Sequence, residues 1–131
     1  MIGLDTNVLV RYIMQDDAKQ AAKATKLIES LSPEDPGFVT LVSVIELVWV
    51  LSSCFDLTRE QISQALDALL RAKQLVVDQA DQVVRALRIY SSRSADFADC
   101  LIERTASSAG CAKTMTFDVA ASKQAGMTLI Q

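Results

Sequence analysis

The chain has 131 residues, of which half are hydrophobic and 22% are charged, and its net charge is −3. This length fits one domain with a substantial core, and the composition excludes an intrinsically disordered chain. The absence of histidine excludes Ser-His-Asp triads and histidine-ligated zinc, so carboxylates become the main candidates for catalysis.

The first part of the chain alternates short β-rich runs with helical periods. We expect a strand over 1–5, helices over 7–14 and 17–31, a strand over 38–42 and a helix that begins at Ser43. Thr6 or Asn7 is expected to cap the first helix. The helix after Ser43 is apolar nearly all round, which predicts that it is buried.

The second part continues the same alternation to the end of the chain. We expect a helix from Thr58, a strand over 75–77, helices over 80–92 and 96–110, a strand over 113–118, a short helix and a strand over 127–130. Thr58 and Gln61 have the form of a capping box, and Gly110 is expected to end its helix. The alternation predicts an α/β fold with a largely parallel sheet. No repeat or linker interrupts it, so a single domain over 1–131 is expected.

The negative net charge means that the average field does not attract nucleic acid, so RNA binding needs local basic patches or bound cations. Cys54, Cys100 and Cys111 have no metal-like spacing, and each is predicted to be a small buried hydrophobe in a reducing compartment. The apolar run over 41–51 is too short to span a bilayer and contains a glutamate. Charged residues also interrupt the N-terminal apolar stretch. We therefore expect a soluble cytoplasmic protein without a membrane segment.

Four acidic residues follow strands or begin helices. Asp5 and Asp118 end predicted strands, Glu46 lies one turn into the helix after the second strand, and Asp99 lies in the first turn of a later helix. Ligands of open parallel sheets bind beyond the carboxyl ends of the strands, so these side chains are predicted to converge on one pocket. A site with only oxygen ligands suits Mg²⁺ or Mn²⁺.

Each acidic residue also has a purely structural explanation. The aspartates at strand ends are common turn and N-cap residues. Ser43 and Glu46 have capping-box spacing, and Asp96 and Asp99 have the spacing of a cap and its partner. Against this, Glu46 is the only ionisable group on an apolar helix, where a carboxylate needs a cation or several donors. Four carboxylates without a counter-charge would also repel one another.

Four motifs in order, MIGLDTNVLV, SVIEL, DFADCLIE and TFD, resemble those of the PIN-domain ribonucleases, most closely the VapC-type toxins of prokaryotic toxin–antitoxin modules. The resemblance covers essentially the whole chain. It implies a PIN-like three-layer α/β/α sandwich with a central parallel sheet. It also implies that the catalytic and metal-binding residues are Asp5, Glu46, Asp99 and Asp118. Supporting polar residues would be Thr6, Asn7, Ser43 and Thr116, with Asp96 as an additional acidic position.

The resemblance further implies a Mg²⁺-dependent endoribonuclease, with Mn²⁺ as a substitute, that hydrolyses RNA phosphodiester bonds. It would act as a toxin that inhibits translation or growth, with a cognate antitoxin and a second copy of the chain as partners. Arg85 and Arg88 share a helical face, with Arg93 just beyond and Arg11 after the first motif. These are candidates for RNA contacts, although a solvated helix face explains any one of them.

Other functions fit the sequence less well. A phospho-receiver domain would use Asp78 at the end of the third strand, but no acidic pair follows the first strand, and Lys113 precedes its strand. A catalytically silent PIN-like binding module is opposed by the presence of all four carboxylates. Structured DNA as the substrate is opposed by the lack of any additional DNA-binding segment.

Overall fold

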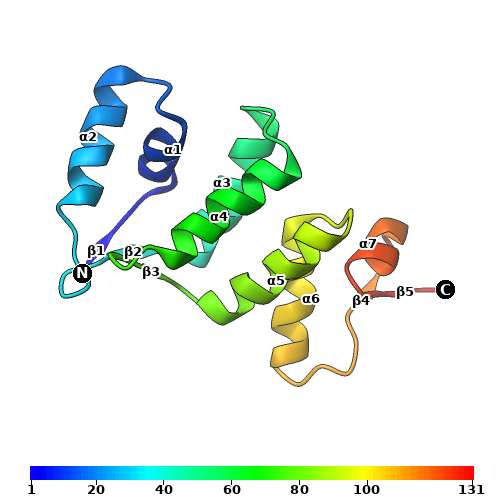
Figure 1. The fold of residues 1–131 in the computed structure, drawn as a ribbon. Coiled ribbons are helices and arrows are strands. Elements are labelled where there is room, and N and C mark those ends of the chain that lie inside the picture. The colour runs from blue at the N-terminus through cyan, green and yellow to red at the C-terminus, as the bar shows by residue number, and fades with distance from the viewer. The chain divides into compact units, whose positions relative to one another are not determined.

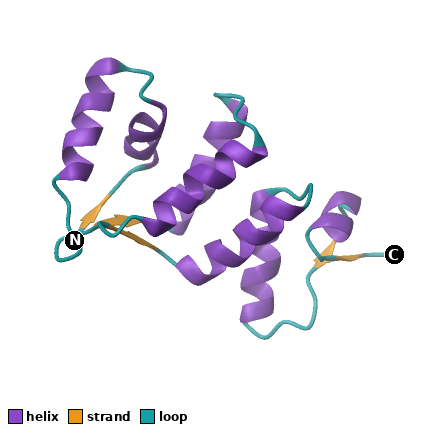
Figure 2. Ribbon diagram, viewed as in Figure 1, coloured by secondary structure: helices purple, strands orange, loops and turns teal.

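A computed structural model describes all 131 residues and divides the chain into two compact units, Met1–Ala80 and Asp81–Gln131. We call these the N-terminal unit and the C-terminal unit. Helices predominate and the strands are short (Figure 1, Figure 2). The expectation of a single domain over 1–131 stays a prediction. None of the helices has the length and apolar character that a bilayer-spanning helix requires.

The N-terminal unit is a parallel sheet with four helices. Its elements are β1 (Ile2–Gly3), α1 (Thr6–Met14), α2 (Ala18–Glu29), β2 (Gly37–Val39), α3 (Leu41–Ser53), α4 (Arg59–Arg71) and β3 (Leu75–Val77). The strand order is β1-β2-β3, and both pairs are parallel. The α1–α2 connection leads from β1 to its neighbour β2, and the α3–α4 connection leads on to β3 in the same direction. Right-handed crossovers in one direction place both helix pairs over the same face of the sheet. Leu9, Val39, Leu47, Leu51 and Leu66 are fully buried there.

The start of α3 differs from the prediction. The strand expected over 38–42 ends at Val39, and the helix begins at Leu41 instead of Ser43. The reason is Thr40, the N-cap, whose side-chain oxygen accepts a hydrogen bond from the Ser43 N–H at 3.1 Å. This local cap outweighs the β propensity of the residues around it.

The expectation that α3 is buried all round is also wrong. One side of the helix packs into the core, but Trp49 and Val42 are 63% and 66% exposed. Two of the three cysteines depart from prediction in the same way, because Cys54 and Cys111 are exposed and only Cys100 is buried. An apolar sequence is compatible with burial, but packing decides which of its faces is covered.

The C-terminal unit contains a second, smaller parallel pair. Its elements are α5 (Ala80–Ser92), which begins at the junction, α6 (Phe97–Ser108), β4 (Met115–Thr116), α7 (Val119–Gln124) and β5 (Thr128–Leu129). The strands β4 and β5 pair in parallel. Tyr90 of α5 and Phe97 of α6 pack edge to face, with ring centroids 5.7 Å apart.

Several predicted boundaries are confirmed. The strand over 75–77 and the helix over 80–92 occur as expected. Thr58 and Gln61 form both hydrogen bonds of the capping box. Gly110 follows the end of α6 with φ +100°, a conformation that favours glycine. The α/β class with parallel strands is therefore confirmed at the level of the elements.

Candidate metal centre

Thr6 connects the two candidate carboxylates of the N-terminal unit. Asp5 is the N-cap of α1, and its Oδ1 accepts a hydrogen bond from the Thr6 N–H at 2.8 Å. The hydroxyl of Thr6, a buried residue, donates to Glu46 Oε1 at 2.8 Å. Asp5 thus takes the capping role that was predicted for Thr6 or Asn7. Thr6 is left free to orient a carboxylate that lies forty positions further along the chain.

The capping-box explanation of Glu46 is wrong. Because Thr40 caps α3, Ser43 lies within the helix, and its hydroxyl is 3.2 Å from that of Thr40. The carboxylate of Glu46 instead meets Thr6 from α1. Ser43 is buried against the cap, whereas Glu46 is largely exposed. The position of Glu46 therefore has no local capping function to explain it.

Asp5 and Glu46 open onto a common pocket of about 480 Å³. Its polar wall comes mainly from α1 and α3, and its apolar wall from the later part of α3 and the residues that follow it. Arg11 also lines the pocket, but its guanidinium is engaged by Asp16 at 3.1 Å and by Gln20 at 2.7 Å. Among the candidates for RNA contacts, Arg11 is thus already paired.

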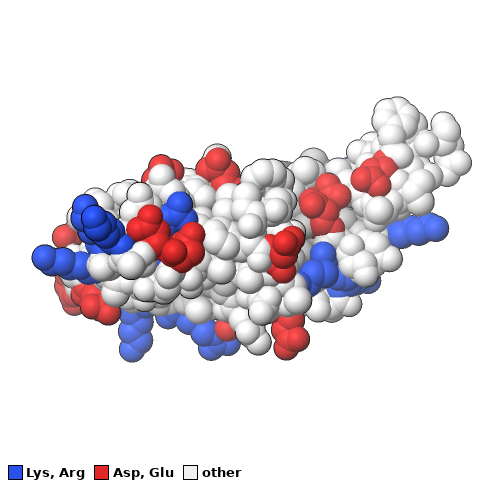
Figure 3. Space-filling view, turned by 90° about the horizontal axis from the view of Figure 1, so that it is seen from above, with Lys and Arg blue, Asp and Glu red and all other residues white.

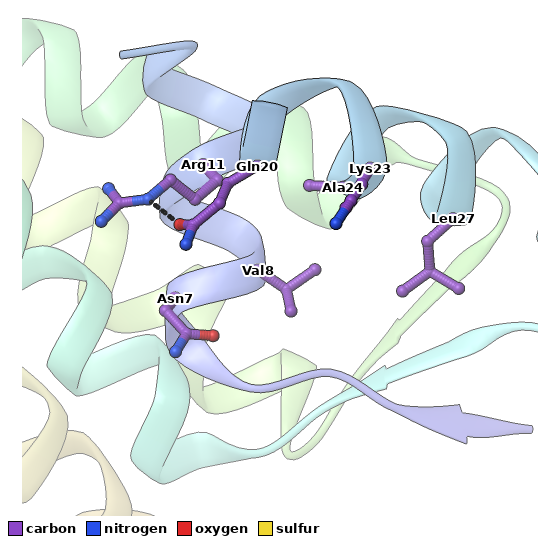
Figure 4. Close-up of a pocket in the computed structure, with 7 residues that line it drawn as sticks. All are labelled: Asn7, Val8, Arg11, Gln20, Lys23, Ala24 and Leu27. Carbon is purple, nitrogen blue, oxygen red and sulfur yellow. Dashed lines mark hydrogen bonds between the residues drawn. The ribbon is translucent and has the colours of Figure 1, made fainter. Parts of the chain in front are cut away.

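A second pocket, of about 260 Å³, lies between α1 and α2. In Figure 4, Arg11 and Gln20 face each other across it, joined by their hydrogen bond, while Val8 and Leu27 supply apolar surface. Asn7 lines this pocket as well as the one that contains Asp5 and Glu46. Asn7 is exposed and lies at the edge of the candidate site.

The C-terminal unit brings together the other acidic candidates. Asp96 is the N-cap of α6, and its Oδ1 accepts a hydrogen bond from the Asp99 N–H at 3.0 Å. Asp118 is the N-cap of α7, and its Oδ1 accepts from the N–H groups of Ala120 and Ala121. The Thr116 hydroxyl accepts from the Asp118 N–H at 2.9 Å. Thr116 and Asp96 thus each contact the backbone of a candidate ligand.

Capping and metal binding are compatible in these aspartates. In Asp5, Asp96 and Asp118 the hydrogen bonds of the cap all go to Oδ1. A carboxylate has two oxygens with about four acceptor sites, so Oδ2 remains for a cation. The cap also fixes the orientation of the side chain. The structural explanation therefore accounts for where these aspartates lie, and leaves each with a free oxygen.

The surroundings of Asp99 perturb its protonation. Partial burial raises its pKa above the ordinary aspartate value, and the negative charges of Asp96 and Asp118 raise the pKa further. Asp99 and Asp118 therefore lie close enough to repel each other. A divalent cation between such carboxylates would replace this repulsion with attraction.

The donors are suited to a hard cation. They are carboxylate oxygens, without histidine or a cysteine cluster, which fits Mg²⁺ or Mn²⁺ better than Zn²⁺. No group of three or more His, Cys, Asp or Glu side chains in the structure is placed to hold a metal ion. The four candidates occur as two pairs, one in each unit, so their action as one set stays a prediction.

A family model of the PIN domain matches residues 2–126. The chain belongs to the PIN-domain family. It is also 28% identical, over 115 residues, to a VapC ribonuclease of Aquifex aeolicus (strain VF5), a match that covers 87% of this chain and 84% of that protein. The PIN-domain match confirms the predicted fold class, a PIN-like α/β/α sandwich with a parallel sheet.

Two features of this PIN domain were not found from the sequence. Thr40 was placed inside a strand, although Thr40 and Ser43 have the spacing of a helix N-terminus. Arg104 was not considered, although it pairs with the nearly buried Glu103. The like charges of Asp99 and Glu103, one helical turn apart, were a signal that a cation had to lie nearby.

Proposed function

We propose that this PIN domain is a metal-dependent endoribonuclease that hydrolyses RNA phosphodiester bonds. The observation that carries the proposal is the pair of hydrogen bonds through which Thr6 connects Asp5 and Glu46, two of the predicted ligands, at one pocket. Membership of the PIN-domain family and the similarity to a VapC ribonuclease support the same activity.

In this proposal Asp5, Glu46, Asp99 and Asp118 are the ligands of one or two Mg²⁺ ions, with Mn²⁺ as a substitute. The bound metal supplies a nucleophilic water at neutral pH and neutralises charge on the phosphate. Thr6 holds the carboxylate of Glu46, and Thr116 and Asp96 fix the backbone at Asp118 and Asp99. Such supporting contacts keep the ligand oxygens oriented before the metal binds.

We further infer a biological role as the toxin of a toxin–antitoxin pair, which inhibits translation or growth by cutting RNA. This role rests on the similarity to the VapC ribonuclease. A cognate antitoxin and a second copy of this chain are the protein partners that follow from it. The exposed apolar residues of α3, Val42 and Trp49, are compatible with a protein contact.

The test is cleavage of a mixed panel of RNAs by the purified chain, with Mg²⁺, with Mn²⁺ and with EDTA, beside the Asp5→Asn and Asp99→Asn variants. We expect cutting that needs the metal and disappears in both variants. Full metal-dependent cutting by Asp5→Asn would refute the assigned site. Absence of both cutting and Mn²⁺ binding would indicate a silent binding module instead.

A further inference from the structure

The C-terminal unit contains a pocket of about 360 Å³ that is distinct from the carboxylate pairs. It lies where the end of α5, the middle of α6 and the turn after α7 meet. Three arginines line it, Arg88, Arg93 and Arg104, together with Glu103 and Gly126. Helix α5 thus contributes Arg88 to this pocket, whereas its neighbour Arg85 does not line it.

Arg104 is held in place by a nearly buried carboxylate. The Glu103 side chain is 11% exposed, and its Oε1 lies 2.6 Å from Nε and 2.5 Å from Nη2 of Arg104. A charge-assisted pair of this kind fixes the plane of the guanidinium. The pair engages one edge of Arg104, so N–H groups at the other edge remain for a ligand.

The charge of the pocket is opposite to that of the whole chain. Arg88 and Arg104 bring two positive charges to a pocket that Glu103 lines with one negative charge, in a chain whose net charge is −3. Figure 3 shows basic side chains close to acidic ones on the surface. Anion binding by this chain therefore depends on local sites.

Gly126 leaves space at the inner wall of the pocket. Its φ is +82°, a conformation that side chains rarely adopt, and a Cβ there would lie about 3.9 Å from the Glu103 carboxyl carbon. Glycine therefore satisfies the backbone of the turn without adding a side chain over the ion pair. The pocket remains open beside the guanidinium of Arg104.

We propose that this arginine pocket binds a phosphate group of the RNA backbone. Guanidinium groups match the geometry of phosphate oxygens, and the volume exceeds that of one phosphate group. Contacts of this type position a nucleic acid without reading its sequence. The inference rests on the proposed ribonuclease function and deepens it, because it assigns Arg88 and Arg104 to substrate positioning.

The test compares Arg88→Gln with Arg85→Gln, two exposed arginines of the same helix of which only Arg88 lines the pocket. Both are made in a protein that also carries Asp99→Asn, which is expected to abolish cleavage, and Mg²⁺ is present in the assay. Binding of a labelled single-stranded RNA is measured by fluorescence anisotropy at several salt concentrations. We expect Arg88→Gln to weaken binding about tenfold, the usual loss for one charge-assisted contact.

The salt dependence should change as well. The slope of log K against log salt is negative, and each lost phosphate contact reduces its magnitude by about 0.7 for single strands. Arg85→Gln should change the affinity and the slope much less. Equal effects of the two variants would overturn the inference and indicate a general field effect. Equal melting temperatures of the two variants show that folding does not cause the difference.

A second measurement separates this inference from the proposed function. Loss of RNA binding in Arg88→Gln would support the pocket even if the wild type cuts no RNA, in which case only the nuclease proposal fails. Inorganic phosphate is tested alone by its effect on melting temperature. Suppose that phosphate raises the melting temperature of the Asp99→Asn protein and that Arg88→Gln abolishes this effect, while the Asp99→Asn protein binds no RNA. In that case the pocket is a site for free anions and the RNA assignment is overturned. Absence of binding to either probe also overturns it.

Discussion

At the scale of single residues, Thr6 contacts both candidate carboxylates of the N-terminal unit, one through its backbone and one through its side chain. Its N–H completes the cap that Asp5 makes on α1, and its hydroxyl donates to Glu46 on α3. Thr6 is buried and its bond to Glu46 is partly buried, so removal of the hydroxyl leaves the carboxylate of Glu46 with one donor fewer. The position of Glu46 should therefore depend on Thr6.

This dependence predicts the effect of Thr6→Val, which removes the hydroxyl and keeps the branched shape. We expect Mn²⁺ affinity and cleavage to fall by about 10- to 100-fold, the usual effect of losing a contact that orients a metal ligand. Thr6→Ser keeps the hydroxyl and should retain most of the affinity. Titration of Mn²⁺ measures the effect directly, and equal affinities for Val and Ser at position 6 would contradict it.

Asp99 predicts a dependence of stability on pH and metal. Because its pKa is raised in the folded protein, the folded state holds the proton more tightly than the unfolded state. The free energy of unfolding therefore falls as pH rises from the ordinary aspartate pKa through the raised pKa of Asp99. At neutral pH the folded protein bears the full cost of the ionised Asp99.

Asp99→Asn removes this penalty, so in EDTA at neutral pH it should melt at a higher temperature than the wild type. The difference should disappear at pH values below the ordinary aspartate range. Addition of Mn²⁺ should reverse the order, because the wild type gains a ligand that the variant has lost. Melting curves at several pH values, with and without Mn²⁺, check all three statements. A variant that is less stable in EDTA at neutral pH would refute the argument.

At the scale of the elements, helix N-termini determine much of this structure. Threonines cap α3 and α4, whereas aspartates cap α1, α2, α6 and α7. Three of these four aspartate caps, those of α1, α6 and α7, are acidic residues that were predicted from the sequence to lie in or beside the metal site. In these helices the residue that ends the preceding loop both starts the helix and presents a carboxylate oxygen.

The two threonine caps offer a matched comparison. Thr40→Ala and Thr58→Ala should each lower the free energy of unfolding by about 1 kcal/mol, the usual value for an N-cap. Of these two helices, α3 carries the candidate ligand Glu46 and α4 carries none. Only Thr40→Ala should therefore also weaken Mn²⁺ binding. Denaturant titration gives the stability and Mn²⁺ titration the affinity. Equal losses of affinity in both variants would show that the effect follows overall stability.

At the scale of the whole molecule, the candidate ligands are divided between the two compact units, two in each. The family match extends over both units. If the four ligands form one site in one domain, the chain should unfold in one cooperative transition. The same bound metal should then stabilise both units.

This is tested by two core substitutions, Leu47→Ala in α3 and Leu101→Ala in α6, both at buried positions. Each should lower stability by about 2–5 kcal/mol. In a single cooperative domain, both variants show one calorimetric transition at a lower temperature. Two transitions, of which each substitution shifts only one, would show that Met1–Ala80 and Asp81–Gln131 unfold independently.

The sequence by itself determined the features that depend on near neighbours. The bounds of β3 and α5, the capping box at Thr58 and the glycine at the end of α6 follow from hydrogen bonds and backbone preferences within a few residues. The acidic candidates were also found this way, because aspartates stand where strands end and helices begin. Their selection as a metal set came from the family resemblance.

Only the tertiary structure decided which of these residues meet. The contact of Thr6 with Glu46, the separation of Arg88 from Arg85 and the exposure of Trp49 are not set by local sequence. Helical periodicity gives the face of a residue on its own helix, but a partner on another helix depends on how the two helices pack. That packing is a property of the whole core, because many small contacts must be satisfied together.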